Sequence, residues 1–367
     1  MGSTPYNSPD RFAVANKEGA PRVWLHRYAC LVAFSTLLLI AAGGMVTSTG
    51  SGLSVPDWPN TYGENLFLFP PSKWVGGIFY EHGHRLIASA VGMLTIGLAV
   101  WIHRTEERRW MRRLGWIALC VVIAQGILGG MTVKFNLPTW ISVFHACLAQ
   151  SFFCITLSIA VFTSRLWMNR GSRTTMEPDG RLRAVALCLV AVVFLQLFLG
   201  ALMRHTHSGL AVPDFPLAYG RLIPGLTESD IADYNHQRAF NYLHVETALP
   251  EVTREQVLVH MIHRAGAVLV ILAVLAAMIV VLSRRVGGLF RRPVYLMAIL
   301  VAGQIAMGAW TVLSGRTPWI ATGHVAIGAL LLGVSVTFAL RVFGLTRVVP
   351  CRLDAAAPNH AIRGMAA

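Results

Sequence analysis

Long apolar runs separated by short polar segments dominate the chain. Each of eight runs is close to the roughly 20 residues that a membrane-spanning helix needs. They cover Tyr28–Val46, Leu86–Ile102, Leu114–Val133, Trp140–Phe162, Ala184–Met203, Ala265–Leu282, Val294–Val312 and Trp319–Leu340. A segment that crosses lipid has no water to bond its backbone, so it has to be helical. The pattern therefore predicts an all-α membrane protein with eight transmembrane helices.

Composition supports a membrane protein rather than a soluble one. Of the 367 residues, 55% are hydrophobic and only 13% are charged, and the mean hydropathy is +0.57. Soluble domains carry roughly 25% charged residues. A large soluble protein can bury apolar helices, but eight such runs in one chain argue against that interpretation.

The distribution of charge predicts how the chain enters the membrane. The segments before the first run, after the second, fourth and sixth runs, and after the eighth each contain four or five Lys or Arg. The alternate loops hold ten of the seventeen acidic residues. Cytoplasmic loops carry such an excess of basic residues, so both termini are predicted to be cytoplasmic. The net charge of +14 forms no basic patch with interleaved aromatics, and no nucleic acid is expected as a partner.

The chain contains an internal duplication. Gly43–Gly63 matches Gly200–Gly220 at eleven of twenty-one positions, at an offset of 157. Further on, an offset of 179 pairs His84 with His263. Because each half holds four helices, both halves enter the membrane in the same orientation, and we expect two tandem four-helix bundles related by a pseudo-twofold axis along the membrane normal. The predicted units are a cytoplasmic tail (1–23), a first half (24–170), a cytoplasmic linker (171–183), a second half (184–345) and a cytoplasmic tail (346–367).

The repeated element S-G-L-x-V-P-D-x-P-x-x-Y-G lies in the first outer loop of each half. Its Gly and Pro favour turns, and its Asp can bond local amides. Two interpretations stay open: a re-entrant lid over the mouth of the bundle, or a loop that contacts a ligand there. The second loop is longer by 179 minus 157, or 22 residues, and the added length falls after Gly220.

Four histidines occupy duplicated positions near the outer ends of apolar helices. His84 pairs with His263, and His145 with His324, each of the latter two lying five residues after a Trp. One His from each of two facing helices can supply both axial ligands of a haem iron. A lone interfacial His bonded to a neighbour is the simpler interpretation, but four in matched register favour ligation. Copper or zinc ligation competes less well, because the helices hold few carboxylates and no CxxC motif.

The residues around these histidines differ between the halves. Arg85 and Arg264 follow His84 and His263 directly and are candidates to pair with haem propionates, although a snorkelling Arg explains them as well. Glu81 precedes His84 by three residues and so shares its helix face, whereas His260 stands at the matched position. A partly buried carboxylate can act as an acid or base, which makes Glu81 the candidate catalytic residue. Its alternative role is a carboxylate that favours the helix N-terminus.

The remaining histidines lack this register. His82 lies two residues from His84 and should point nearly the opposite way on a helix. His205 and His207 have Ser48 and Gly50 as counterparts and are expected to be solvated loop residues.

With these residues in place, the chain resembles the haem A synthase family of cytochrome oxidase assembly, from about residue 24 to 345. The resemblance rests on E-x-x-H-R at Glu81–Arg85, H-R at His263–Arg264, His145, His324 and the duplicated loop. It implies oxidation of a methyl substituent of haem O to the formyl group of haem A through a hydroxymethyl intermediate.

The resemblance also implies a role for each half. The first would receive the substrate haem between His84 and His145, with Glu81 near the reacting edge, and the second would hold a haem b cofactor between His263 and His324. The implied partners are haem O, membrane lipid, a haem O synthase and an electron donor, in the bacterial inner membrane. A homo-oligomer is left open. Some relatives carry a cysteine pair in the outer loops, which this chain lacks.

Two other functions compete. A di-haem b-type electron-transfer protein would explain the His pairs but not the difference between Glu81 and His260. A transporter would fit a duplicated bundle, but transporters commonly have helices broken by Pro, and the apolar runs here contain none.

Overall fold

The computed structural model describes residues 10–169, 180–239, 249–284 and 287–345. Within these ranges the chain has helices and no strand, and eight helices are long and apolar enough to cross a membrane. They are α1 (Asp10–Ser48), α2 (Gly77–Thr105), α3 (Arg109–Lys134), α4 (Thr139–Thr163), α6 (Gly180–His205), α8 (Arg254–Ser283), α9 (Gly288–Leu313) and α10 (Pro318–Leu345). This confirms the predicted eight-helix membrane protein.

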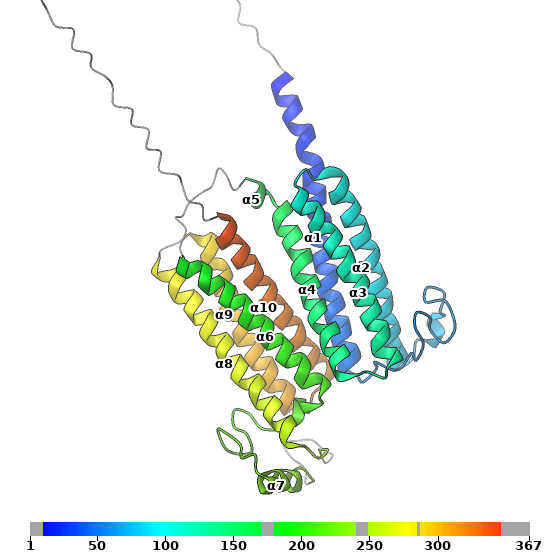
Figure 1. The fold of residues 1–367 in the computed structure, drawn as a ribbon, viewed down its shortest axis with the longest axis vertical. Helices are drawn as coiled ribbons and strands as arrows, with labels where there is room; N and C mark the ends of the chain where they lie inside the picture. The colour runs from blue at the N-terminus through cyan, green and yellow to red at the C-terminus, as the bar shows by residue number, and fades with distance from the viewer. Residues whose placement is uncertain (1–9, 170–179, 240–248, 285–286, 346–367) are drawn as a thin grey trace, which may run out of the picture.

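The helices are longer than the apolar runs that predicted them. The helical backbone of α1 begins at Asp10, within the predicted tail, although its apolar span starts at Arg22. Most of the predicted linker and the whole C-terminal tail lie outside the described residues. Shorter elements join the membrane helices: η1 (Pro71–Lys73), α5 (Arg165–Met168), η3 (Ser208–Leu210) and α7 (Glu228–Ala239). Helix α7 occupies the extra length after Gly220 and projects from one end of the molecule (Figure 1).

The membrane helices form two groups of four (Figure 1). In the first, α1 packs against α2 and α4, and α3 contacts both of these helices. In the second, α6 packs against α8 and α10, and α9 contacts both of these. The groups meet where α1 and α4 contact α10 and α4 contacts α6. The contact pattern repeats between the groups, while the axis that relates them stays a prediction.

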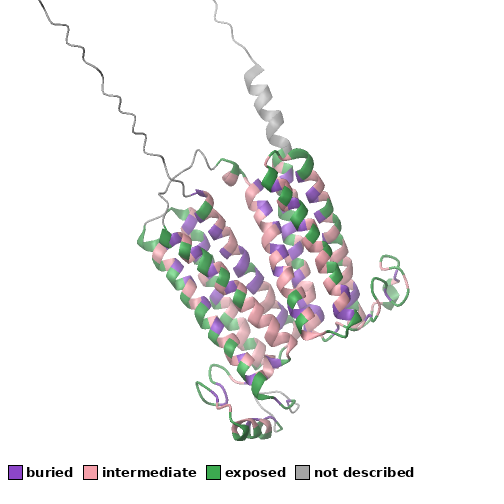
Figure 2. Cartoon of the chain, viewed as in Figure 1, coloured by how far each residue is buried: buried purple, intermediate pink, exposed green. Residues whose placement is uncertain are grey.

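Each group has its own apolar core, and the outer faces suit lipid. Leu98 and Ile159 are fully buried in the first core, and Leu189 and Phe338 in the second. The buried positions run along the helices, and exposed ones cover the outer faces (Figure 2). Ile279, with 68% of its surface exposed, is typical of those faces. Large apolar patches of this kind are rare on soluble monomers, which agrees with a lipid surround.

Pro293 corrects one expectation, because it lies inside α9. The helix begins six residues before the apolar run that predicted it. Proline has no N–H to donate to the carbonyl four residues earlier, which here belongs to Leu289. Nη1 of Arg341 donates to that carbonyl instead, at 3.1 Å. The side chain from α10 therefore supplies the bond that Pro293 removes.

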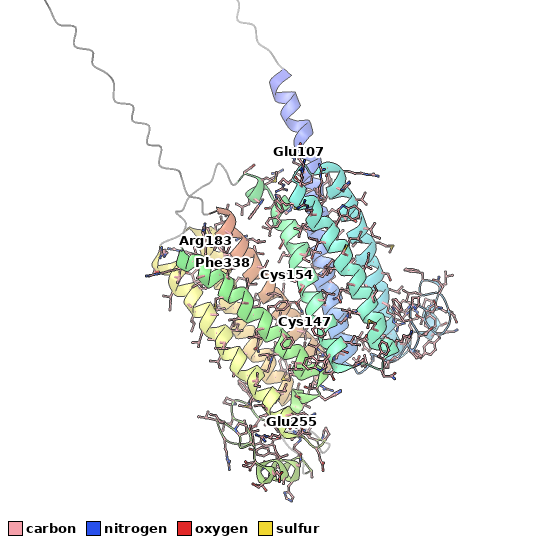
Figure 3. The ribbon with its side chains drawn as sticks, in the orientation of Figure 1. Glu107, Cys147, Cys154, Arg183, Glu255 and Phe338 are labelled. Atoms are coloured by element: carbon pink, nitrogen blue, oxygen red, sulfur yellow. The ribbon has the colours of Figure 1, made fainter. Side chains whose placement is uncertain are left out.

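The five described cysteines are free, and all lie on membrane helices. Cys147 and Cys154 are on α4, between the levels of Glu107 at one end of the molecule and Glu255 at the other (Figure 3).

Candidate functional site

The four matched histidines lie on four different helices: His84 on α2, His145 on α4, His263 on α8 and His324 on α10. The ring centroids of His263 and His324 are 6.5 Å apart, with the ring planes at 72°. Two metal–nitrogen bonds of about 2 Å each, plus half a ring on either side, span roughly 6 Å. The separation in the second half therefore fits two axial ligands on one iron. His84 and His145 belong to the same four-helix group, in which α2 and α4 each pack against both α1 and α3.

Three of the four imidazoles have no hydrogen-bond partner among the described residues. Nδ1 is buried and unpartnered in His84, His145 and His324. Four of the histidines outside the matched register do have a polar contact to the ring. Two of them contact backbone carbonyls at 3.0 Å: His26 that of Ala160, and His260 that of Ser208. The other two contact side chains: His82 lies 3.0 Å from Thr61 Oγ1, and His103 accepts a hydrogen bond from Trp116 at 3.3 Å. Each of these four rings therefore has a polar neighbour, although Nε2 of His82 is also buried and unpartnered. Of the matched set, only His263 has a polar contact to its ring, from Gln196.

A glycine on the adjacent helix makes room for each matched imidazole. A Cβ added at that glycine would approach Cε1 of the ring a few tenths of an ångström closer than the usual 3.5–4.0 Å between carbon atoms. The distances are 3.0 Å for Gly43 and His84, 3.3 Å for Gly129 and His145, 3.2 Å for Gly200 and His263, and 3.1 Å for Gly308 and His324. These four glycines, which we call the ring-seat glycines, are themselves matched at the offsets of 157 and 179.

Glutamine amides hold the histidine-bearing helices. Gln125 Nε2 donates to the carbonyl of His145 at 3.1 Å, and the matched Gln304 donates to that of His324 at 2.6 Å. Gln196 has no polar counterpart, because Leu39 stands at the matched position. Its Nε2 donates to the His263 carbonyl at 3.0 Å and lies 3.2 Å from Nδ1 of that ring. The second half thus has a polar contact to its histidine ring that the first half lacks.

The two arginines bind the duplicated loops. Nη1 of Arg85 donates to the carbonyls of Asp57 and Asn60, at 2.7 and 2.9 Å, and Nη2 to that of Val55 at 2.8 Å. Arg264 donates to the three matched carbonyls, those of Asp214 at 2.6 Å, Leu217 at 2.8 Å and Val212 at 3.4 Å. Any contact of these arginines with haem propionates, as predicted, would have to use the N–H groups that do not bond to the loop carbonyls. Each arginine fixes its outer loop over the helix that carries the histidine.

The loops are further stabilised by their repeated aspartates. Asp57 accepts the amides of Tyr62 and Gly63, each at 2.8 Å, and Asp214 accepts those of Tyr219 and Gly220 at 2.8 and 2.9 Å. Burial opposes ionisation of Asp57, but its amide hydrogen bonds outweigh that effect and hold its pKa below the ordinary value.

Glu81 is the point at which the halves differ most. The residue is 3% exposed, Oε2 accepts the Val55 amide at 2.7 Å, and Oε1 accepts a hydrogen bond from Nη2 of Arg85 at 2.6 Å. With a donor on each oxygen, the group is arranged as a carboxylate. His260, at the matched position, is equally buried and bonds to the Ser208 carbonyl. Both residues tie a helix start to the outer loop, but only Glu81 places a titratable acid beside a matched histidine.

With the geometry established, comparison with known proteins identifies the family. A family model described as "Cytochrome oxidase assembly protein" matches residues 26–336. The chain belongs to this family. It is 27% identical to "Heme A synthase" of Sphingopyxis alaskensis, over 89% of this chain and 93% of that protein. It is also 27% identical to "Heme A synthase" of Methylobacterium radiotolerans, over 95% and 96%, and of Shouchella clausii, over 79% and 87%. The resemblance stated from the motifs is thereby confirmed.

Several other polar residues of the structure were not found by sequence reasoning. Arg204, expected in an outer loop, ends α6 and donates to the Gly44 carbonyl at 2.6 Å and to Ser48 Oγ, which joins the two halves. Arg238 on α7 is 2% exposed and donates to the carbonyls of Leu210 and Pro250 at 2.7 and 2.8 Å. The only signal for Arg204 was its place at the end of an apolar run.

Proposed function

We propose that this protein is a haem A synthase that oxidises a methyl substituent of haem O to the formyl group of haem A through a hydroxymethyl intermediate. One observation carries the proposal beyond family membership. The histidines in matched register have rings that are largely uncommitted to other side chains and are seated on glycines, and the pair in the second half has the separation that an iron requires. The course of the oxidation is what the resemblance to the haem A synthase family implies.

The two halves have different roles in this proposal. The first receives haem O between His84 and His145, and the second holds haem b between His263 and His324. A resident haem b supplies one-electron redox chemistry when bound. Gln196 contacts only the second-half pair, and an additional polar contact to a ligand suits a cofactor that stays in place rather than a substrate that leaves.

Glu81 is the proposed catalytic acid or base. Its carboxylate lies on the same helix as His84, three residues away, and is buried with Arg85 as its ion-pair partner at 2.6 Å. A carboxylate so held can accept a proton from a group on the substrate edge. The second half has His260 in its place, which supports a cofactor site there. Arg85 and Arg264 shape the outer loops and are proposed to offer their remaining N–H groups to the propionates.

We place the protein in the bacterial inner membrane with both termini in the cytoplasm. The eight spanning helices require a multi-pass protein, and the excess of basic residues at one set of loops supports this orientation. Reporter fusions at residues 20, 230 and 360 test it, because only the fusion at 230 should report from the outside. An external signal from residue 20 or 360 would overturn the orientation. A haem O synthase and an electron donor are the partners this activity requires.

A di-haem electron-transfer protein is the second candidate, favoured by the close likeness of the two histidine sites. Extraction of pigment from the purified full chain, with chromatographic identification of each haem, separates the two. We expect haem b together with haem O or its oxidised derivatives. Two equivalents of haem b, with no conversion in cells that supply haem O, would establish the electron-transfer alternative instead.

A further inference from the structure

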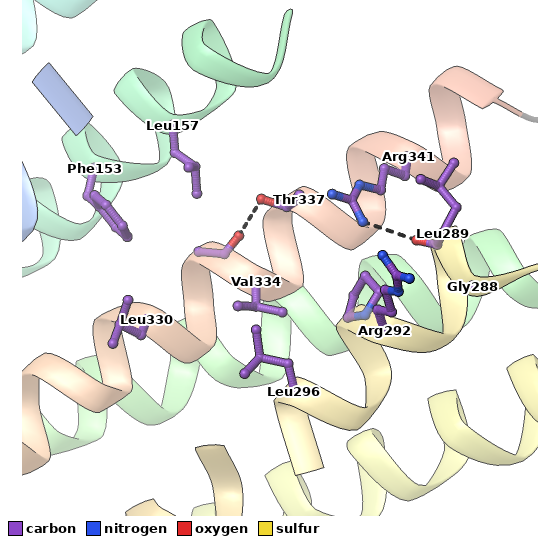
Figure 4. A pocket seen from close by; sticks show the side chains of 12 residues that line it. Phe153, Leu157, Gly288, Leu289, Arg292, Leu296, Leu330, Val334, Thr337 and Arg341 are labelled. Carbon is purple, nitrogen blue, oxygen red and sulfur yellow. Dashed lines mark hydrogen bonds between the residues drawn. The ribbon is translucent and has the colours of Figure 1, made fainter. Parts of the chain in front are cut away.

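A cavity of about 610 Å³ lies between the two halves, at the end of the molecule where α4 and α10 finish and α9 begins. We call it the arginine groove, because Arg292 of α9 and Arg341 of α10 line one end of it. Phe153 and Leu157 of α4 face these helices from the first half, and Leu330 lies toward the other end (Figure 4). The groove is thus cationic at one end and apolar along the rest.

Its dimensions match one leaflet of a membrane. Arg292 follows the start of α9 by four residues and Arg341 precedes the end of α10 by four, so each lies about 6 Å inside its helix end. Leu330 is eleven residues before Arg341 on α10, or about 16 Å along the axis. Half of a hydrocarbon core of ~30 Å is about 15 Å. The groove therefore runs from headgroup depth toward the middle of the bilayer.

Neither arginine has an anionic partner among the residues that the structure describes. None of the residues that line the groove is acidic, and the ion pairs formed within the described ranges include neither Arg292 nor Arg341. Arg341 gives one N–H to the Leu289 carbonyl and keeps the rest of its guanidinium for another acceptor. Two guanidinium groups at one end of an apolar cavity repel each other unless an anion lies between them. Arginine is the side chain best suited to bind a phosphate through paired N–H groups.

We propose that the arginine groove is a binding site for an anionic phospholipid. The phosphate accepts hydrogen bonds from Arg292 and Arg341, and one acyl chain lies along Leu330, Leu157 and Phe153. Basic pockets between membrane helices on the cytoplasmic side bind such headgroups, and the charge pattern assigns this end to the cytoplasm. Because the groove contacts both halves, the bound lipid joins them at the end opposite to the Arg204 contact. The proposal is independent of the haem chemistry.

The test compares lipid binding by the purified full chain and by variants. Native mass spectrometry in detergent would follow titration with phosphatidylglycerol, and separately with phosphatidylcholine, which has the same acyl chains but no net charge. Arg292→Gln/Arg341→Gln removes the cationic end. The control Arg109→Gln/Arg113→Gln removes the same charge from exposed positions of α3 at the same end of the molecule. Leu330→Trp keeps both groove arginines and obstructs the acyl path.

Each basic side chain near an anionic lipid is worth about 5-fold in affinity, so the groove variant should bind phosphatidylglycerol about 30-fold more weakly than the parent. The control should bind like the parent, and Leu330→Trp should lose the tight site while keeping its charge. Equal affinity of the parent for the two lipids would overturn the proposal. So would unchanged phosphatidylglycerol binding in the groove variant, or a tightly held quinone or haem that excess phosphatidylglycerol fails to displace.

Discussion

In the proposed function His324 binds the resident haem, so replacing Gly308 by alanine should weaken haem binding there without disturbing the helix that carries the glycine. The new Cβ would lie 3.1 Å from Cε1 of the imidazole, 3.6 Å from Nδ1 and 3.8 Å from Nε2. Normal carbon contacts begin near 3.5 Å, so the ring has to move by a few tenths of an ångström. A metal ligand tolerates such a shift poorly, because its nitrogen is fixed at bonding distance from the iron.

The magnitude follows from the cost of inserting one methyl into a packed site. Overpacking of this kind costs about 1–3 kcal/mol, which corresponds to roughly 5- to 150-fold weaker haem binding. Alanine also favours a helix over glycine by about 1 kcal/mol. Gly303 of the same helix is the matched control, since a Cβ there has nothing within 4 Å. Gly303→Ala carries the same helix effect, so the difference between the two variants isolates the contact with His324.

The assay is the rate at which the resident haem transfers to an excess of a haem-scavenging apoprotein, followed in the Soret band. We expect Gly308→Ala to lose haem about 5- to 150-fold faster than Gly303→Ala. Equal rates would refute the view that Gly308 seats a ligand. The first half offers the same comparison, with Gly129→Ala against Gly126→Ala, where only the former meets a histidine. That pair should affect retention of the substrate haem and leave the haem at His324 in place.

Other substitutions test the separate roles. Glu81→Gln should lower haem A formation by about 10²- to 10⁴-fold while haem b stays bound, and haem A yields equal to those of the parent at matched expression would leave Glu81 as a loop anchor. His263→Ala and His324→Ala should each remove the low-spin spectrum of the resident haem, and a full spectrum in both variants would show that the ligands are elsewhere. Gln196→Leu, which copies Leu39 of the first half, should shift the midpoint potential of that haem by up to about 60 mV, equivalent to a tenfold change in ligand preference. If the variant retained haem with an unchanged potential, the contact between Gln196 and His263 would not influence the haem. If the parent protein held no haem, the proposed haem site in the second half would itself be wrong.

The sequence by itself determined the eight helices and the internal duplication. Lipid leaves a long apolar segment no alternative to the helix, and duplication preserved the register of His84, His145, His263 and His324. The proposed division of roles draws on one difference between the halves, Glu81 against His260, which is visible without a structure.

Only the tertiary structure decided what these residues touch. Nothing in the sequence marks the four ring-seat glycines, among the 33 glycines of the chain, as contacts of a histidine. In the structure, each contacts its histidine from another helix. Gln196 reaches His263 across 67 residues, and Arg341 replaces the donor that Pro293 lacks across 48. The sequence suggested propionate partners for Arg85 and Arg264, whereas the folded loops present carbonyls to both. Contacts of this kind depend on how helices that are distant in the chain pack together. The hydrophobic pattern of a sequence predicts only that a helix spans the membrane, so it could not predict them.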